Sequence, residues 1–353
     1  MKGLWVASIG AAVVAVVLLT RMAGYLVDVE QPQCSLEPHD KWRTAHSCLT
    51  AYAEAARFAA EAERNVYDPA LYEGRFMSGL KVDTYHYPPP FLVVPDALQR
   101  ATGGYLELRP VWFGLQLAAL LAAVLLIARW LGGELQPRVL LGAPLFFLAP
   151  TTLFTLQMGN FQSTAFALSL LGMIGLVSTR AGAQALGALA FAFAALSKVF
   201  PGVLGIYLIV TRRWRALAWI AGASVALVAA ALAVYGTQPF ADFIHYQVPR
   251  LSSGEAFPQA EGARTAAGNM SFYGALVKLR TLGITGLDRS TGLAINSIYG
   301  VLVLALAAAA CWRQRRADLA DPDARFSTLM LWLALLDLAS MRSPFVGGAY
   351  GIG

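Results

Sequence analysis

Residues 183–215 read AQALGALAFAFAALSKVFPGVLGIYLIVTRRWR, an apolar stretch that one charged residue, Lys198, interrupts and three arginines end. It forms either one long helix or two shorter ones that reverse at Lys198. Lysine and arginine accumulate in short cytoplasmic loops. If the stretch forms two helices, all the basic clusters of the chain lie on the same side of the membrane. If it forms one helix, the last two clusters lie on the opposite side. The clusters are Lys2, Arg129 with Arg138, Arg180, Arg212-Arg213-Trp214-Arg215 and Arg313-Gln314-Arg315-Arg316. We therefore predict a hairpin.

The composition around this stretch excludes a soluble globular domain. The 353 residues are 57% hydrophobic and only 14% charged, with a mean hydropathy of +0.56. These values exceed what one soluble core can bury. The net charge of +6 indicates no nucleic-acid partner, because the arginines lie beside apolar runs and set membrane orientation. We predict an all-α polytopic protein of the cell (plasma or inner) membrane.

Nine apolar runs are long enough, or nearly long enough, to span a bilayer. They are Leu4 to Leu26, Pro110 to Leu131, Val139 to Leu156, Ser163 to Ser178, Ala183 to Leu196, Val199 to Val210, Trp214 to Tyr235, Leu293 to Trp312 and Phe326 to Ser340. We expect residues 1–353 to form one membrane-embedded domain with these nine transmembrane segments.

The face opposite Lys2 then receives two long loops, 27–109 and 236–291. Within the first loop, residues 51–64 place small apolar side chains on one side of a helix and charged ones on the other, which predicts a helix along the membrane interface. The polar turns around Gln157 and Lys198, and also Arg342, fall on this outer face. The polar residues at apolar run ends therefore share one side of the bilayer.

Cysteines and short motifs narrow the chemistry. Cys34 and Cys48 both lie in the first outer loop, where an oxidising compartment would allow a disulfide or leave two free thiols. Cys311 is expected to be an inert apolar residue. No zinc-ligand spacing, glycine-rich phosphate loop or Gly-x-Ser-x-Gly elbow is present. The chemistry is expected from carboxylates and hydrogen-bonding side chains.

A set of short motifs resembles glycosyltransferase family 87, whose members include polyprenol-phosphate-dependent mannosyltransferases of the GT-C class. The motifs are Tyr52 to Arg57 leading to Asn65-Val66-Tyr67-Asp68-Pro69, Tyr87-Pro88-Pro89, Gly159-Asn160-Phe161-Gln162, Lys198 with Pro201, Gly268-Asn269-Met270-Ser271 and Arg342-Ser343-Pro344-Phe345. The resemblance implies a GT-C-like helical bundle, a polyprenyl-phosphate-linked sugar donor, a glycolipid or glycan acceptor, and an active site on the extracytoplasmic side. Such enzymes usually continue with further helices, so a truncated C-terminus stays open.

The resemblance also implies an aspartate base in the first outer loop, and here the chain departs from the pattern. The family aspartate precedes the tyrosine equivalent to Tyr52 by about four residues, where this chain has Cys48. We predict that Asp40 serves instead, with Asp28 and Asp83 as alternatives. The other interpretation of Asp40 is a solvated or helix-capping residue.

The remaining polar residues of the outer face supply candidate ligands for the donor, with Lys198, Arg342 and His245 for its phosphate. For its sugar or lipid they are Tyr85, Tyr87, Pro88, Gln157, Asn160, Gln162, Asn269 and Ser271. An ionisable residue beside apolar helices is a functional hypothesis by default, and arginine suits a phosphate well. The competing interpretations are snorkelling cations, hydrogen bonds between helices, aromatic belt residues and helix caps.

A lipid or sugar transporter or flippase is the alternative function. Its polar residues are expected near the bilayer midplane in broken helices, usually with a repeated half. Here the polar residues gather at one end of the apolar runs, and no repeat of fixed period is present. The pattern therefore favours an enzyme.

We expect no cofactor and no required divalent ion. The resemblance implies a single phosphate as leaving group, and fixed cations can stabilise one phosphate as its charge develops. Transfer should therefore continue when a chelator is added. Activity that a chelator abolishes and manganese restores would contradict this expectation.

Overall fold

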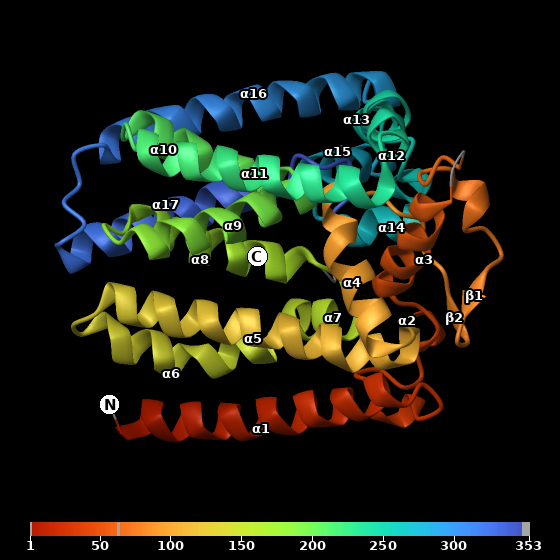
Figure 1. The fold of residues 1–353 in the computed structure, drawn as a ribbon, viewed down its shortest axis with the longest axis horizontal. Helices are drawn as coiled ribbons and strands as arrows, with labels where there is room; N and C mark the ends of the chain where they lie inside the picture. Colours follow the sequence, from red (N-terminus) through yellow and green to blue (C-terminus); the bar gives the residue numbers. More distant parts are fainter. Residues whose placement is uncertain (1, 62–63, 348–353) are drawn as a thin grey trace.

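The computed structural model describes residues 2–61 and 64–347, and almost all of its regular structure is helical. The long helices run side by side, with the N-terminus and the short connecting loops at one end and a cap of short elements at the other (Figure 1). The bundle helices are α1 (Lys2–Val27), α5 (Tyr105–Leu131), α6 (Leu135–Leu148), α7 (Pro150–Met158), α8 (Gln162–Val177), α9 (Ala181–Ser197), α10 (Gly205–Val210), α11 (Trp214–Tyr235), α16 (Arg289–Gln314) and α17 (Pro322–Ser340).

The cap is built from the two segments predicted as outer loops. It contains α2 (Lys41–Thr44), α3 (Cys48–Ala60), α4 (Val93–Thr102), the two-residue strands β1 (Phe76–Met77) and β2 (Leu80–Lys81), α12 (Gln238–Asp242), α13 (Val248–Ser253), α14 (Ala263–Gly268) and α15 (Phe272–Thr281). Single turns join these elements: η1 (Pro32–Cys34), η2 (Pro69–Leu71), η3 (Pro89–Leu92), η4 (Phe200–Leu204), η5 (Phe243–Gln247) and η6 (Pro258–Glu261). The turn η4 lies in the bundle rather than in the cap.

The described residues contain four helices long and apolar enough to cross a membrane. They are α5, α11, α16 and the part of α1 from Trp5 to Val27. They become five if α6 and α7, which are bent by 59°, count as one span. The bend falls at Pro150, whose missing N–H and ring end regular helix, so the run predicted from Val139 to Leu156 is not straight. The all-α membrane class is confirmed, whereas the number of nine spans stays a prediction.

The chain reverses at Lys198, as the hairpin interpretation predicts. The Nη1 group of Arg213 donates to the backbone oxygen of Val177 at 3.3 Å, so the turn after α10 meets the end of α8, just before α9 begins. Similarly, Nη1 of Arg325 donates to the oxygen of Trp130 at 2.6 Å. The loops that carry the arginine clusters therefore gather at the end of the bundle away from the cap (Figure 1).

Helix α3 differs from its predicted place along the membrane interface. It begins at Cys48 and ends at Ala60, and its apolar side chains, with Tyr52 and Phe58 the largest, are buried in the cap core. On the charged side of the helix, Arg57 forms an ion pair with Glu54 at 2.8 Å. The pattern of small apolar residues therefore marks close packing inside the protein.

Helices α8 and α9 pack closely because glycines face each other across their contact. A Cβ atom added to Gly187 would lie 2.7 Å from the backbone oxygen of Gly172 and 2.9 Å from Cα of Gly175. Small residues allow helix backbones to approach in a membrane, where van der Waals packing dominates association. This contact fixes α9 and hence the position of Lys198 at its end.

The substitution Gly187→Ala should destabilise the protein, because backbone atoms would have to move to admit the methyl group. Overpacking of this kind costs about 1–3 kcal/mol. Gly182→Ala in the same helix is the matched control, because a Cβ there meets nothing within 4 Å. Thermal unfolding in detergent should show a lower Tm for the first variant only. Equal midpoints for the two variants would contradict the packing argument.

Candidate active site

The site is built around the ring of Tyr87, between the cap and the bundle. The hydroxyl of Tyr52 donates to the hydroxyl of Tyr87 at 3.0 Å, and the backbone N–H of Phe161 donates to Tyr52 at 3.4 Å. The ammonium nitrogen of Lys198 lies 4.5 Å from the centre of the Tyr87 ring. An aromatic face attracts a cation in this geometry. Tyr87 thus connects the cap to the turn that follows α9.

Further tyrosines fix the segment that carries Tyr87. The hydroxyl of Tyr67 donates to the backbone oxygen of Tyr87, and that of Tyr85 donates to the oxygen of Pro88, each at 3.0 Å. Tyr67 and Tyr85 are fully buried. Desolvation on burial raises their pKa values well above the ordinary range, so both stay protonated donors. The segment from Tyr85 to Pro88 is therefore held rigidly.

His86, half-buried between these tyrosines, faces the second outer segment. The amide nitrogen of Gln247 lies 2.9 Å from Nδ1 of His86. Gln247 ends a π-helical turn, η5, a form often found at functional sites. Desolvation, together with the positive charges of Arg250 and Lys198, holds the pKa of His86 down at about 4, although Asp83 opposes the shift. His86 is therefore neutral at physiological pH.

Two cations near His86 have no carboxylate partner among residues 2–61 and 64–347. Lys198 rests on Tyr87, whereas Arg250 lies 4.7 Å from the ring centre of Tyr246 and donates from Nη1 to the oxygen of Tyr67 at 3.3 Å. Other arginines of the cap, such as Arg57 and Arg100, do form ion pairs. The site therefore has an excess of positive charge that suits an anion.

The predicted amides lie beside this site, and two of them are engaged with the protein. The Oε1 atom of Gln157 accepts from the N–H of Leu36 at 2.8 Å. The Oδ1 atom of Asn160 accepts from the N–H of Gln162 at 2.9 Å, and its Nδ2 approaches Cys48 Sγ at 3.4 Å. No hydrogen bond of the Gln162 side chain occurs within the described part of the chain. Their binding of a sugar stays a prediction.

Asn269 and Ser271 hold the last described segment in place. Nδ2 of Asn269 and the hydroxyl of Ser271 both donate to the oxygen of Pro344, at 3.0 and 3.1 Å. These two hydrogen bonds position the next residue, Phe345, which stacks on Phe257. The ring of Phe257 lies 5.1 Å from the ring of His86. Asn269 and Ser271 are therefore connected to His86 indirectly, through Phe345 and Phe257.

Arg342, His245 and Asp40 occupy other surroundings. Arg342 is exposed and its side chain lies against Gly300 of α16. His245 is exposed on the π-helical turn, two residues before the glutamine that meets His86. Asp40 caps α2 by accepting from the N–H of Trp42 and Arg43. The structure does not bring these three together with Lys198.

No disulfide joins Cys34 and Cys48 in the described structure. Cys34 packs against Gly24 of α1, whereas Cys48 begins α3 beside Asn160. The two thiols belong to different hydrophobic clusters, one around α1 and one around α3. The short sequence separation of the two cysteines allowed a disulfide, but the packing places them in different clusters.

Sequence reasoning missed the contributions of Gln247 and Arg250. Neither lies at the end of an apolar run, and a π-helical turn has no clear sequence signature. The aromatic residues around Arg250 were the available signal. Within the described residues, no group of three histidine, cysteine or acidic side chains is placed to hold a metal ion.

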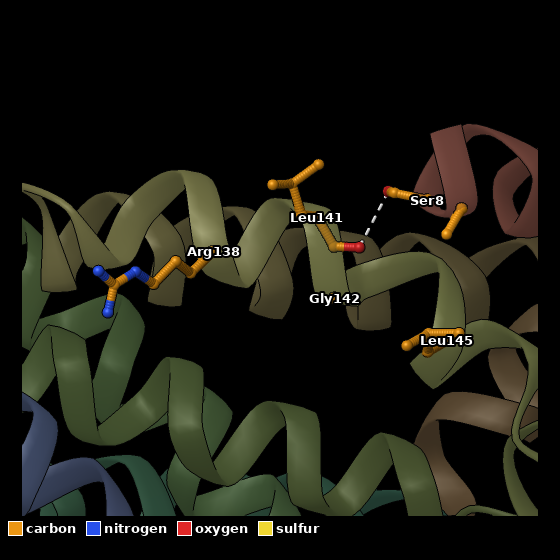
Figure 2. Close-up of a pocket in the computed structure, with 6 residues that line it drawn as sticks. Ser8, Arg138, Leu141, Gly142 and Leu145 are labelled. Atoms are coloured by element: carbon orange, nitrogen blue, oxygen red, sulfur yellow. Dashed lines mark hydrogen bonds between the residues drawn. The ribbon is translucent and has the colours of Figure 1, made fainter. Parts of the chain in front are cut away.

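A cavity of about 250 Å³ lies elsewhere, between α1 and α6. Ser8, which donates to the oxygen of Leu141 at 2.9 Å, and Arg138 are its polar lining residues (Figure 2). The other lining residues are apolar or glycine, and Arg138 pairs with Glu134. The cavity is therefore a gap between two helices rather than part of the site.

Fold and site together define a helical membrane protein with an unneutralised cationic site under a cap. The model of a family described as glycosyltransferase family 87 matches residues 85–344, well over half of the chain. The chain therefore belongs to glycosyltransferase family 87 and is a glycosyltransferase. Neither the curated proteins nor the solved structures give a match.

The pKa of His86 generates a testable dependence of stability on pH. Because the folded state holds this pKa below 6.5, the unfolded state binds more protons between about pH 6.5 and pH 4. Stability should therefore fall as the pH is lowered through this window, and less so in the variant His86→Gln. Thermal unfolding in detergent across the window measures the difference. The exposed His39→Gln is the control, and equal slopes for all three proteins would count against a neutral, desolvated His86.

Proposed function

We propose that this glycosyltransferase takes its sugar from a polyprenyl-phosphate-linked donor and places it on a hydroxyl group of a glycolipid or glycan at the extracytoplasmic face. Mannose is the sugar that the family resemblance favours. The observation that carries the proposal is the pair Lys198 and Arg250, whose charges no carboxylate neutralises in the described chain and which both act on His86. A phosphate supplies the missing negative charge.

The positions of the two cations favour a bound anion. An uncompensated cation between a membrane bundle and its cap is costly, and the cost is removed by an anion bound there. Tyr87 and Tyr246 supply part of the compensation through their ring faces. Because ring faces are neutral, the pair still favours a ligand with a formal negative charge.

The arrangement suits a single displacement. The acceptor oxygen forms a bond to the anomeric carbon while the bond from that carbon to the phosphate oxygen breaks, and the electron pair passes to the phosphate. Lys198 and Arg250 stabilise the charge that grows on this leaving group. A carboxylate of the first outer loop takes the proton of the acceptor hydroxyl. The sequence indicates Asp40 for this role, with Asp28 and Asp83 as alternatives.

The place of the basic loops supports the proposed sidedness. The arginine-rich loops lie at the end of the bundle opposite the cap, and such loops stay in the cytoplasm. The cap with Lys198 and Tyr87 then faces outward, where a lipid-linked donor is used. Nothing in the fold or in the comparisons favours the transporter alternative.

The test measures transfer of labelled mannose from polyprenyl-phosphate mannose in membranes that contain the native chain, Lys198→Ala or Arg250→Ala. Each substitution should reduce transfer by about 10²–10³-fold, as expected when a group that stabilises developing charge is removed. Lys41→Ala, which removes an exposed lysine of the cap, is the matched control.

Three outcomes distinguish the parts of this proposal. Loss in both variants with an unaffected Lys41→Ala supports a phosphate site at the two cations. Full activity in both variants overturns that site. No transfer by the native chain with mannosyl, glucosyl or other polyprenyl-phosphate sugars overturns the donor class.

A further inference from the structure

The carboxylates suggested for the base differ sharply in what they contact. Asp40 accepts from two backbone N–H groups of α2 and pairs with Arg43 at 3.2 Å. Asp28 accepts from the N–H of Glu30 and from the amide of Gln31 in its own turn. Their hydrogen bonds are therefore local, and these bonds stabilise a turn or a helix end.

Asp83 instead reaches a residue far away in the sequence. Its Oδ1 atom lies 2.7 Å from Nε2 of His46. The two side chains meet because a parallel bridge pairs His46 with Lys81, and because the N–H of Lys81 donates to the oxygen of Ala45 at 2.8 Å. The ring of Trp42 stacks on His46 at 4.4 Å and fixes its plane.

The other ring nitrogen of His46 settles where its proton lies. Nδ1 is buried and has no hydrogen-bond partner in the described chain. A proton there would be a buried, unsatisfied donor, which costs free energy. Nε2 is therefore the ring nitrogen that donates in the hydrogen bond to Asp83.

One oxygen of Asp83 is left for chemistry. Oδ2 has no hydrogen-bond partner among the described residues, and the side chain keeps 25% of its surface exposed. The backbone N–H of Asp83 donates to the hydroxyl of Thr50 at 3.1 Å, which places this carboxylate against the first turn of α3. Asp83 is therefore held in place yet accessible.

Asp83 also shares its surroundings with the two unneutralised cations. It is the carboxylate whose charge acts on His86, the same ring that Lys198 and Arg250 influence. Only two residues separate Asp83 from His86, and Tyr87 beneath Lys198 follows directly. A proton acceptor and the positive charge for a leaving group are thus joined by one rigid segment.

We infer that Asp83 is the base of the transfer reaction and that His46 is its positioning residue. The inference rests on the proposed function. Oδ2 of Asp83 accepts the proton of the acceptor hydroxyl as the oxygen bonds to the anomeric carbon, and the polyprenyl phosphate leaves with the electron pair. Protonated Asp83 then releases the proton to water. Removing a general base costs about 10²–10⁴-fold in rate.

The main experiment compares two nucleophiles with Asp83→Asn. With the hydroxyl acceptor, kcat should fall about 10²–10⁴-fold while KM for the donor stays near its native value. With azide, an anion that has no proton to lose, the variant should form glycosyl azide at close to the native rate. Retained azide transfer also proves that the variant is folded and binds the donor.

His46 needs a readout of its own. His46→Gln keeps a nitrogen donor near the Nε2 position and should retain most of the activity, whereas His46→Ala should lose much of it. Glu73→Gln, which changes an exposed acid of the same cap, is the matched control and should behave as the native chain.

The outcomes separate this inference from the proposed function. If the native chain transfers sugar and Asp83→Asn keeps its rate with the hydroxyl acceptor, Asp83 is not the base. A fall with Asp40→Asn alone would return the role to Asp40. If azide transfer is lost together with hydroxyl transfer, Asp83 serves the structure rather than proton removal. A native chain with no transfer removes the proposed function and this inference with it.

Discussion

The cation of Lys198 over the ring of Tyr87 is the contact on which the site depends. The charge stands where two apolar helices turn, and the ring stands on a segment of the cap. Holding the ring there requires Tyr52 beneath it and Tyr67 behind it, both buried and hydrogen-bonded. Buried tyrosines of the cap core therefore hold this aromatic face in place, and the packing of α8 against α9 positions the charge that meets it.

The features of the site that depend on local sequence pattern could be predicted from the sequence. Lys198 lies within the 28-residue stretch Ala183 to Val210, which apart from Gln184 is otherwise apolar or small, so the stretch is either one helix or a hairpin, and the arginines favour the hairpin. The grouping of Tyr85, Tyr87 and Pro88 near Lys198 also follows once the hairpin is accepted. The number of spans does not, because α8, α9 and the segment Phe200–Val210 are shorter than a usual span and depend on their neighbours.

The parts that depend on distant contacts were out of reach. Asp40 and Asp83 are both loop aspartates in the sequence. In the structure, Asp40 caps the N-terminus of α2, whereas Asp83 contacts His46, which lies 37 positions away in the sequence. Gln247 meets His86 across 161 positions. Local pattern distinguishes neither case, because each depends on which cap segments lie side by side. The family resemblance identified the enzyme class but not these pairings.

The π-helical turn at η5 makes the length of its segment as important as its composition. A π turn holds one residue more than the α-helical turn it replaces, and each residue of a helix rotates its successors by about 100°. Deleting one residue before Gln247 would leave the remaining side chains chemically unchanged and still rotate Gln247 and Arg250 away from their partners His86 and Tyr67. This enzyme therefore carries a constraint on insertions and deletions in Phe243–Gln247 that the residue types of the segment do not reveal.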